Sequence, residues 1–205
     1  MTSSYRLSRM LVWLLLLLPV VFLAGRITAQ RTVEPSCDMC QAELVSLEEI
    51  QQYVSLGQRE TVGDMQIRSL DVGRTQVQVS LVHRNALAER ANRVAEHSLV
   101  SEIYYMLSGG GTVLTGPELV DPVPRASDSY NVTNLNGPGH NARDVRNGVT
   151  TELKAGDVFV IPAGTGHEFI EIPDHATYIT FRVDPDKVVA LMNAEDSAAF
   201  LAERL

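Results

Sequence analysis

The sequence has 205 residues, enough for one ordinary domain or at most two small ones. Hydrophobic residues make up 45% and charged residues 20%, which describes a globular protein and excludes a disordered or fibrous one. The formal net charge is −8, and the sequence contains no basic run or Arg/aromatic patch, so nucleic acid is excluded as a partner and an anionic membrane surface is disfavoured.

The first thirty residues predict an export signal. Arg6 and Arg9 precede an apolar run over residues 10–24, and the small residues Thr28 and Ala29 follow it. We therefore expect a signal peptide over residues 1–29 and an exported mature protein, either periplasmic or secreted. The run is shorter than the roughly 20 residues of a membrane helix. An uncleaved segment is the alternative, and only in that case is a membrane a partner.

Two cysteines, Cys37 and Cys40, lie close to the expected new N-terminus. In an oxidising compartment this pair predicts a small local disulfide. A redox motif would need a βαβ unit around it, and haem attachment would need His at position 41, where Gln41 stands. A structural disulfide is therefore the favoured interpretation.

Residues 30–63 are interpreted as an N-terminal extension with one short helix. Ser46 and Glu49 have the spacing of a capping box, in which the serine caps the helix and the glutamate reaches back. Apolar residues follow at helical spacing and a glycine closes the segment: Leu47, Ile50, Val54 and Gly57.

From about residue 64 the apolar period changes to two, which predicts strands. Val77, Val79 and Leu81 alternate with polar residues, and the same count places His83 on the apolar face. Further strand-like runs are separated by turn residues: Ile103–Leu107, Thr112–Leu114, Thr150–Leu153, Val158–Ile161, His167–Ile172 and Thr177–Val183. This pattern favours an all-β fold, an antiparallel sandwich or barrel.

Two segments break the rhythm of short strands. Residues 116–148 are rich in Pro, Asn, Gly and Asp and are too long for a hairpin loop, which predicts either a functional cover or a disordered insertion. Residues 186–205 are interpreted as a C-terminal helix, with Pro185 suited to its first turn.

Two segments carry the residues for metal chemistry. The first is His97-x4-Glu102-x6-Gly109, and the second is Gly156-Asp157-x4-Pro162-x-Gly164-x2-His167. In the first, a strand ends at His97 and the next begins at Glu102; in the second, a turn returns the chain so that His167 starts a strand. Two imidazoles and one carboxylate on rigid strands form a facial triad with open positions, which suits Fe(II), Mn(II) or Zn(II).

These segments resemble the paired motifs of the cupin superfamily, His-x-His-x4-Glu-x6-Gly and Gly-Asp-x4-Pro-x-Gly-x2-His. The resemblance implies a small jelly-roll barrel over residues 64–185 with a divalent metal ion inside its mouth. It places the metal ligands at His97, Glu102 and His167. The first motif departs from the family pattern at Ala95, where a ligand histidine is expected. We therefore expect weaker metal affinity than a four-ligand site has.

Two of the other three histidines have two interpretations each. His83 either replaces the missing ligand or is a hydrogen-bonded core residue, because a register slip of one residue reverses its direction. His140 in the insert either folds over the barrel mouth or is an exposed loop residue. His175 lies in an expected turn and has no assigned role.

Residues that lie an even number of positions from a ligand on the same strand share its parity and point to the same face, which predicts the residues that line the pocket. Tyr104 and Met106 share parity with Glu102, and Phe169 and Glu171 share parity with His167, whereas Ile103 and Tyr105 face the other way. Arg182, near the end of the last strand, either binds a substrate carboxylate or is a solvated arginine at the rim.

Two functions remain open at this point. The first is a metal-dependent enzyme acting on a small molecule: an oxygenase with Fe(II), or an isomerase or lyase with Zn(II) or Mn(II). The second is a non-catalytic module that binds a small ligand or has a structural role. Cupin-like barrels often dimerise through an outer sheet face, so a structural role would be that of a barrel paired with a second copy as a homodimer. Neither the substrate nor the catalytic residues follow from the sequence.

Overall fold

The computed structural model describes residues 34–38, 40–60 and 62–205. The predicted signal peptide, residues 1–29, lies outside the described residues. The chain divides into two compact units, residues 1–38 and 39–205, and the barrel belongs entirely to the second. Cys37 and Cys40, the only cysteines of the sequence, are both disulfide-bonded, as expected. Within the described residues, no helix has the length and apolar character to cross a membrane.

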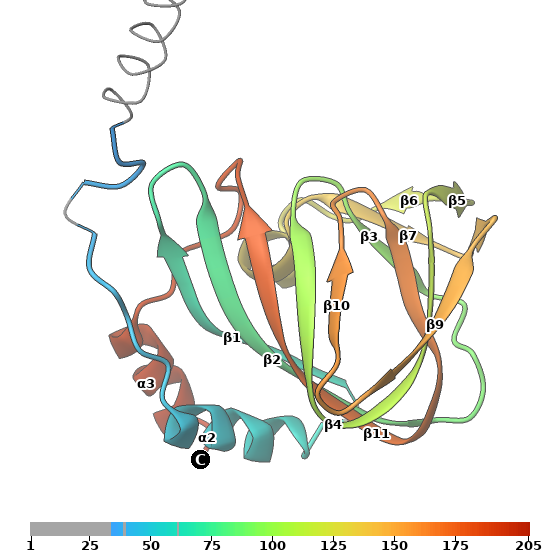
Figure 1. The fold of residues 1–205 in the computed structure, drawn as a ribbon, viewed down its shortest axis with the longest axis horizontal. Helices are drawn as coiled ribbons and strands as arrows, with labels where there is room; N and C mark the ends of the chain where they lie inside the picture. The colour runs from blue at the N-terminus through green and yellow to red at the C-terminus, as the bar shows by residue number, and fades with distance from the viewer. Residues whose placement is uncertain (1–33, 39, 61) are drawn as a thin grey trace, which may run out of the picture. The chain divides into compact units, whose positions relative to one another are not determined.

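The second unit is a mostly-β barrel with a helix before it and another after it, which confirms the predicted fold class (Figure 1). The helices are α2 (Leu47–Gly57) and α3 (Ala194–Ala202), and η1 is a short π-helix (Asn131–Asn136). The strands are β1 (Val62–Asp71), β2 (Gln76–Leu87), β3 (Val94–His97), β4 (Ser101–Gly116), β5 (Glu118–Val120), β6 (Val123–Pro124), β7 (Gly139–Ala142), β8 (Asp144–Arg146), β9 (Val149–Lys154), β10 (Val158–Ile161) and β11 (Gly166–Asp184).

Two long strands connect the two sides of the barrel. β11 pairs with β4 along most of its length, and its second half also pairs with β2, which in turn pairs with β1. The first half of β11 continues through β3 and β7 to β6, while β4 adds β9 and β10. All of these pairs are antiparallel, as the sequence pattern predicted.

Each long strand contains two of the runs that the sequence pattern separated. Residues 103–107 and 112–114 both belong to β4, and residues 167–172 and 177–183 both belong to β11. Glycines let β4 pass close to its neighbours between the two runs. Gly109 has a φ of +66°, and a Cβ there would lie 1.9 Å from the carbonyl oxygen of His175. A side chain at this position would therefore push the two long strands apart.

The sheet formed by β1, β2 and the second half of β11 is buried on both faces. Its inner face contributes Val82 and Tyr178 to the barrel core, and its outer face contributes Leu81 and Ile179 to a second core. The helices α2 and α3 cover this outer face with Tyr53, Leu56 and Leu201. A fully buried side chain of this size contributes about 1.5–3 kcal/mol, so the helices are part of the stable unit.

The N-terminal helix begins as predicted, but its capping differs in one respect. The Ser46 hydroxyl accepts a hydrogen bond from the Glu49 backbone N–H at 3.2 Å. The Glu49 carboxylate does not reach back to the cap; it accepts from Arg68 Nη1 at 2.7 Å and from Ser197 Oγ at 2.7 Å. The expected capping-box glutamate instead binds the helix to β1 and α3.

The C-terminal helix is shorter than predicted, and Pro185 does not begin it. Met192 forms an isolated bridge with Ser69, and this pairing keeps the chain extended after β11. Asn193 then caps α3, where Asp196 completes a capping box with it. The helix therefore starts at Ala194 because the preceding residues are used for sheet pairing.

The insert over residues 116–148 is ordered secondary structure, not a structureless loop. It contains β5 to β8 and η1, and β7 pairs with β3 up to the register His97↔Gly139. A Cβ on Gly139 would lie 2.1 Å from the Glu96 carbonyl oxygen, so glycine permits this close approach. The insert therefore packs directly beside the strand that ends at His97.

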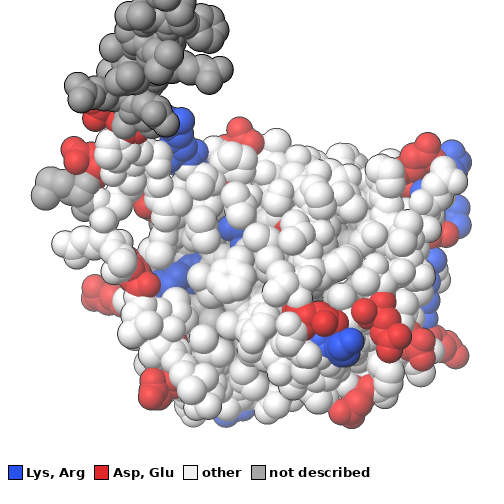
Figure 2. Space-filling view, in the orientation of Figure 1, with Lys and Arg blue, Asp and Glu red and all other residues white. Residues whose placement is uncertain are grey.

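The outer face of β4 and β10 carries apolar side chains in contact with solvent. Tyr105, Val158 and Val160 are 42%, 63% and 59% exposed, which confirms that Tyr105 points away from the interior. Figure 2 shows few charged side chains over this part of the surface. Such a face is suited to an apolar contact.

Candidate metal centre

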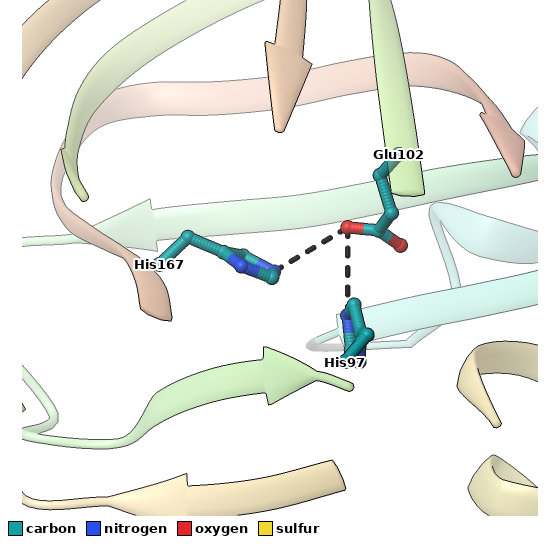
Figure 3. Close-up of side chains that lie close together, drawn as sticks. All are labelled: His97, Glu102 and His167. Carbon is teal, nitrogen blue, oxygen red and sulfur yellow. Dashed lines mark ion pairs between the residues drawn. The ribbon is translucent and has the colours of Figure 1, made fainter. Parts of the chain in front are cut away.

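The three predicted ligands lie together inside the barrel. His97 is the last residue of β3, Glu102 is the second residue of β4, and His167 is the second residue of β11. All three are buried, and Figure 3 shows their side chains directed at one another. Glu102 Oε2 is 3.5 Å from His97 Nε2 and 3.3 Å from His167 Nε2.

This geometry fits a divalent metal ion. The three candidate donor atoms lie within 4.8 Å of one another. Donors that bind one ion at about 2.0–2.2 Å lie roughly 3–3.5 Å apart, so only small shifts are needed. Ala95 shares the inward side of β3 with His97 and lies opposite His167 in the strand register. Since a methyl group cannot coordinate, position 95 supplies no fourth ligand.

Glu102 is held as a carboxylate by its surroundings. Arg182 Nε donates to Oε1 at 2.7 Å, and the Tyr104 hydroxyl donates to Oε2 at 2.9 Å. Burial raises the pKa of Glu102, but attraction to His97 and Arg182 outweighs burial and holds this pKa well below its usual value. The carboxylate is therefore ionised and oriented before any ion arrives.

Arg182 is a buried structural partner of the site, so both predictions for it were wrong. Its Nη1 donates to Gln78 Oε1 at 2.7 Å and to Ser80 Oγ at 3.0 Å, and its Nη2 donates to Asp64 Oδ2 at 2.6 Å. Only 2% of Arg182 is exposed. It is neither a solvated rim residue nor free to bind a substrate carboxylate, because four of its five N–H groups already bond to side chains of β1, β2 and β4.

The two imidazoles have opposite hydrogen-bond partners at Nδ1. His167 Nδ1 lies 3.0 Å from the carbonyl oxygen of Thr165, which only accepts, so this nitrogen carries the proton. His97 Nδ1 lies 3.1 Å from Arg125 Nη1, which only donates, so this nitrogen is the acceptor. Burial lowers the pKa of His97, against the attraction of Glu102 that raises it.

The other histidines lie outside the triad. His83 does share a face with Leu81, but this is the outer face below α2, and its ring bonds to Thr177 Oγ1 and Asn85 Oδ1. The idea that His83 replaces the missing ligand is therefore wrong. His140 lies on β7 with Nδ1 2.9 Å from Glu96 Oε2, so it is neither a ligand nor a loop residue. His175 lies within β11 and contacts Ser108 and Asp174.

The predicted pocket wall is correct except at Glu171. Tyr104, Met106 and Phe169 are buried in the barrel core. A β-bulge between Phe169 and Glu171 shifts the register of β11 against β4. This reverses the parity, so Glu171 is exposed and Ile172 takes the inward position.

Arg84 is a residue of interest that parity alone does not identify. Its Nε donates to the Tyr178 hydroxyl at 3.1 Å, and its guanidinium lies 5.5 Å from the centre of the Phe169 ring. The Tyr178 ring lies tilted against that of Tyr104, with their centres 4.4 Å apart, and Tyr104 bonds to Glu102. Within the part of the chain that the structure describes, no acidic side chain forms an ion pair with Arg84.

A cavity of about 930 Å³ lies beside the barrel and not at the triad. It is bordered by β1, α2, α3 and the insert, and Asp64 and Gln66 form part of its wall. None of His97, Glu102 and His167 lines this cavity. Two residues of its wall are linked to Arg182: Asp64 binds it directly, and the Asn134 carbonyl oxygen accepts from Gln78, which also binds Arg182.

A family model described as Cupin matches residues 66–201. No curated protein matches the chain. The BH2720 protein of Bacillus halodurans aligns over 80% of this chain and 98% of its own, at 16% identity and a TM-score of 0.40. The cupin protein BF4112 of Bacteroides fragilis aligns over 76% and 93%, at 13% identity and 0.35. The DMSP lyase DddQ of Ruegeria pomeroyi aligns over 65% and 52%, at 13% identity and 0.40.

Proposed function

The chain belongs to the cupin family, and from this premise we propose that it binds one divalent metal ion and acts with it on a small molecule. His97, Glu102 and His167 would be the ligands. The observation that carries the proposal is the convergence of two imidazole nitrogens and one carboxylate oxygen within 4.8 Å in the barrel interior. Three such donors leave positions open for a substrate.

The surrounding residues support a role beyond simple folding. Arg182 fixes the carboxylate plane of Glu102 from the side away from the histidines, and Thr165 fixes the ring of His167. Such partners orient metal ligands and strengthen their binding. A bound Zn(II) or Mn(II) ion supplies Lewis-acid chemistry, and Fe(II) supplies O2 chemistry. Tyr104 holds a proton at its hydroxyl 2.9 Å from Glu102 Oε2, because burial and this carboxylate raise its pKa.

The test is metal analysis of protein purified without added metal or chelator. We expect close to one Fe, Mn or Zn ion per chain, and a loss of that ion in Glu102→Gln and His167→Gln. Activity assays against O2-dependent and O2-independent substrate panels would then separate an oxygenase from an isomerase or lyase. Protein that retains no stoichiometric ion, even after loading, would remove the enzyme proposal.

A second candidate function is binding of a small anion without catalysis. The guanidinium of Arg84 favours it, because it is half-buried and bonds to the Tyr178 hydroxyl but forms no ion pair with an acidic side chain of the described residues. In that case, a carboxylate ligand should raise the melting temperature in the presence of chelator and also in Glu102→Ala. Loss of this stabilisation in Arg84→Met would assign it to the guanidinium. If chelator abolishes the stabilisation, the carboxylate ligand binds at the metal site and not at Arg84.

We also propose that the mature protein is exported, beginning near Gln30. The disulfide-bonded state of Cys37 and Cys40 supports this, because such bonds persist in oxidising compartments. Mass spectrometry of the protein from the exported fraction should give a chain lacking residues 1–29. Full-length protein found only in the cytoplasm would contradict export.

A homodimer through the outer face of β4 and β10 is the proposed assembly. The exposed Tyr105, Val158 and Val160 support it, since they offer apolar area on a part of the surface with few charged side chains (Figure 2). Light scattering of the purified protein should give twice the chain mass, and Val158→Lys should give the monomer. A monomeric wild-type protein would exclude this assembly.

A further inference from the structure

Arg125 is an insert residue whose side chain ends at the metal centre. Its backbone N–H donates to the Gly139 carbonyl oxygen at 3.0 Å. Its Nε donates to Asn141 Oδ1 at 3.1 Å, and its Nη2 donates to the His140 carbonyl oxygen at 3.0 Å. These bonds to β7 hold the guanidinium in place and direct Nη1 at His97 Nδ1.

This contact determines where the neutral His97 ring carries its proton. A guanidinium has no acceptor, so Nδ1 must offer its lone pair to Arg125. The proton of the neutral ring is then on Nε2, the nitrogen that faces Glu102 Oε2 at 3.5 Å. A metal ion needs a lone pair at that same nitrogen. His97 is therefore positioned as a ligand but is in the tautomer that cannot coordinate through Nε2.

His167 provides the internal comparison. Its Nδ1–H donates to the Thr165 carbonyl oxygen at 3.0 Å, so a metal ion can replace any proton on Nε2 without disturbing this bond. A backbone carbonyl or carboxylate at Nδ1 is the usual partner of a metal-binding histidine. The triad therefore contains one imidazole prepared for metal and one that is not.

The charge of Arg125 acts in the same direction as its hydrogen bond. Within the described residues, no acidic side chain forms an ion pair with it, although it lies partly buried beside the site. A permanent positive charge that touches a ligand ring disfavours a divalent cation at that ring.

We propose that Arg125 opposes metal loading: the ion binds fully only when Arg125 releases Nδ1, so that His97 can carry its proton there and coordinate through Nε2. This inference rests on the proposed metal site. It gives the insert a specific task, because the residue that controls His97 lies in a segment separate from all three ligands. Arg125 acts through His97 and is a positioning residue.

The first experiment measures the affinity of metal-free protein for Zn(II) alone, by competition with a chelating dye. Arg125→Met keeps an unbranched side chain but removes the donor and the charge, so we expect about tenfold tighter binding or more. Arg125→Lys keeps both a donor and a charge and should stay near wild type. Arg143→Met is the matched control, since Arg143 is in the same insert but pairs with the exposed Asp121.

Equal or weaker Zn(II) binding by Arg125→Met, in a variant that unfolds in urea like wild type, would overturn the inference while leaving the metal site intact. Measurable Zn(II) binding by wild type that becomes about tenfold tighter in Arg125→Met, but not in Arg125→Lys or Arg143→Met, would support it. If neither wild type nor any variant binds Zn(II), both the metal site and the opposing role of Arg125 are refuted.

The second experiment needs neither a variant nor a metal ion. Long-range ¹H–¹⁵N spectra distinguish the two neutral tautomers of histidine. In the metal-free wild-type protein we expect the proton on Nε2 of His97 and on Nδ1 of His167. A proton on Nδ1 of His97 would overturn the inference about Arg125 but would not affect the proposed function.

Discussion

Replacement of Arg182 by methionine should destabilise the protein severely, because it leaves a buried carboxylate without its partner. Glu102 and Arg182 are each 2% exposed, and the Arg182 Nε–Glu102 Oε1 distance is 2.7 Å. Breaking a buried pair by removing one member costs about 3–5 kcal/mol. The contact with Asp64 adds less, since the Asp64 side chain is 25% exposed and partly solvated.

Urea denaturation and the melting temperature measure this cost directly. A loss of about 3–5 kcal/mol in a domain of this size corresponds to a decrease of roughly 6–20 °C in melting temperature. Arg143→Met is the control, because its pair with Asp121 is exposed at 64% and 72% and should contribute about 0–1 kcal/mol. The double variant Arg182→Met/Glu102→Gln should lose less than the sum of the single variants, since no buried charge remains unpaired. A loss under about 1 kcal/mol for Arg182→Met would refute this reasoning.

Three further outcomes are expected. Ala95→His restores a fourth donor on the face of His97, so Zn(II) affinity in the dye competition assay should rise by about tenfold, or 1.4 kcal/mol. Unchanged affinity would mean that position 95 does not face the site. Gly139→Ala forces a Cβ to within 2.1 Å of the Glu96 carbonyl oxygen, so the unfolding free energy measured in urea should decrease by at least about 1 kcal/mol. An unchanged unfolding free energy would contradict the strand register. Burial lowers the pKa of His97 below 6.5 in the folded protein, so the unfolded chain takes up a proton at this histidine first as the pH decreases. The unfolding free energy of metal-free protein should therefore fall as the pH decreases below about 6.5, and it should fall less in His97→Gln. A rise in the unfolding free energy would contradict the direction of the pKa shift.

The fold and the triad could be predicted because both depend on local patterns. Alternation of apolar and polar residues identified most strands, and the spacing of two short motifs identified His97, Glu102 and His167. Predictions from strand parity of where a side chain points were wrong where the answer depended on how the strand packs against distant parts of the chain. His83 was placed on an apolar face correctly, but β2 is buried on both faces, and parity does not say which face is inside the barrel.

The residues around the ligands could not be predicted, because their partners are distant in the sequence. Arg182 is neutralised by Glu102, 80 positions away, and by Asp64, 118 positions away, and nothing in its local sequence indicates burial. Arg125 reaches His97 only because β7 aligns beside β3. Glu171 was placed in the pocket because a single bulge in β11 has no clear sequence signal.

The central claim is most directly tested by anomalous diffraction from crystals of protein loaded with Zn(II). The account predicts one strong peak per chain at about 2.0–2.2 Å from His97 Nε2, Glu102 Oε2 and His167 Nε2, with Arg125 no longer in contact with His97 Nδ1. A peak that lies elsewhere on the molecule, or the absence of any peak from protein soaked at saturating Zn(II), would contradict the account.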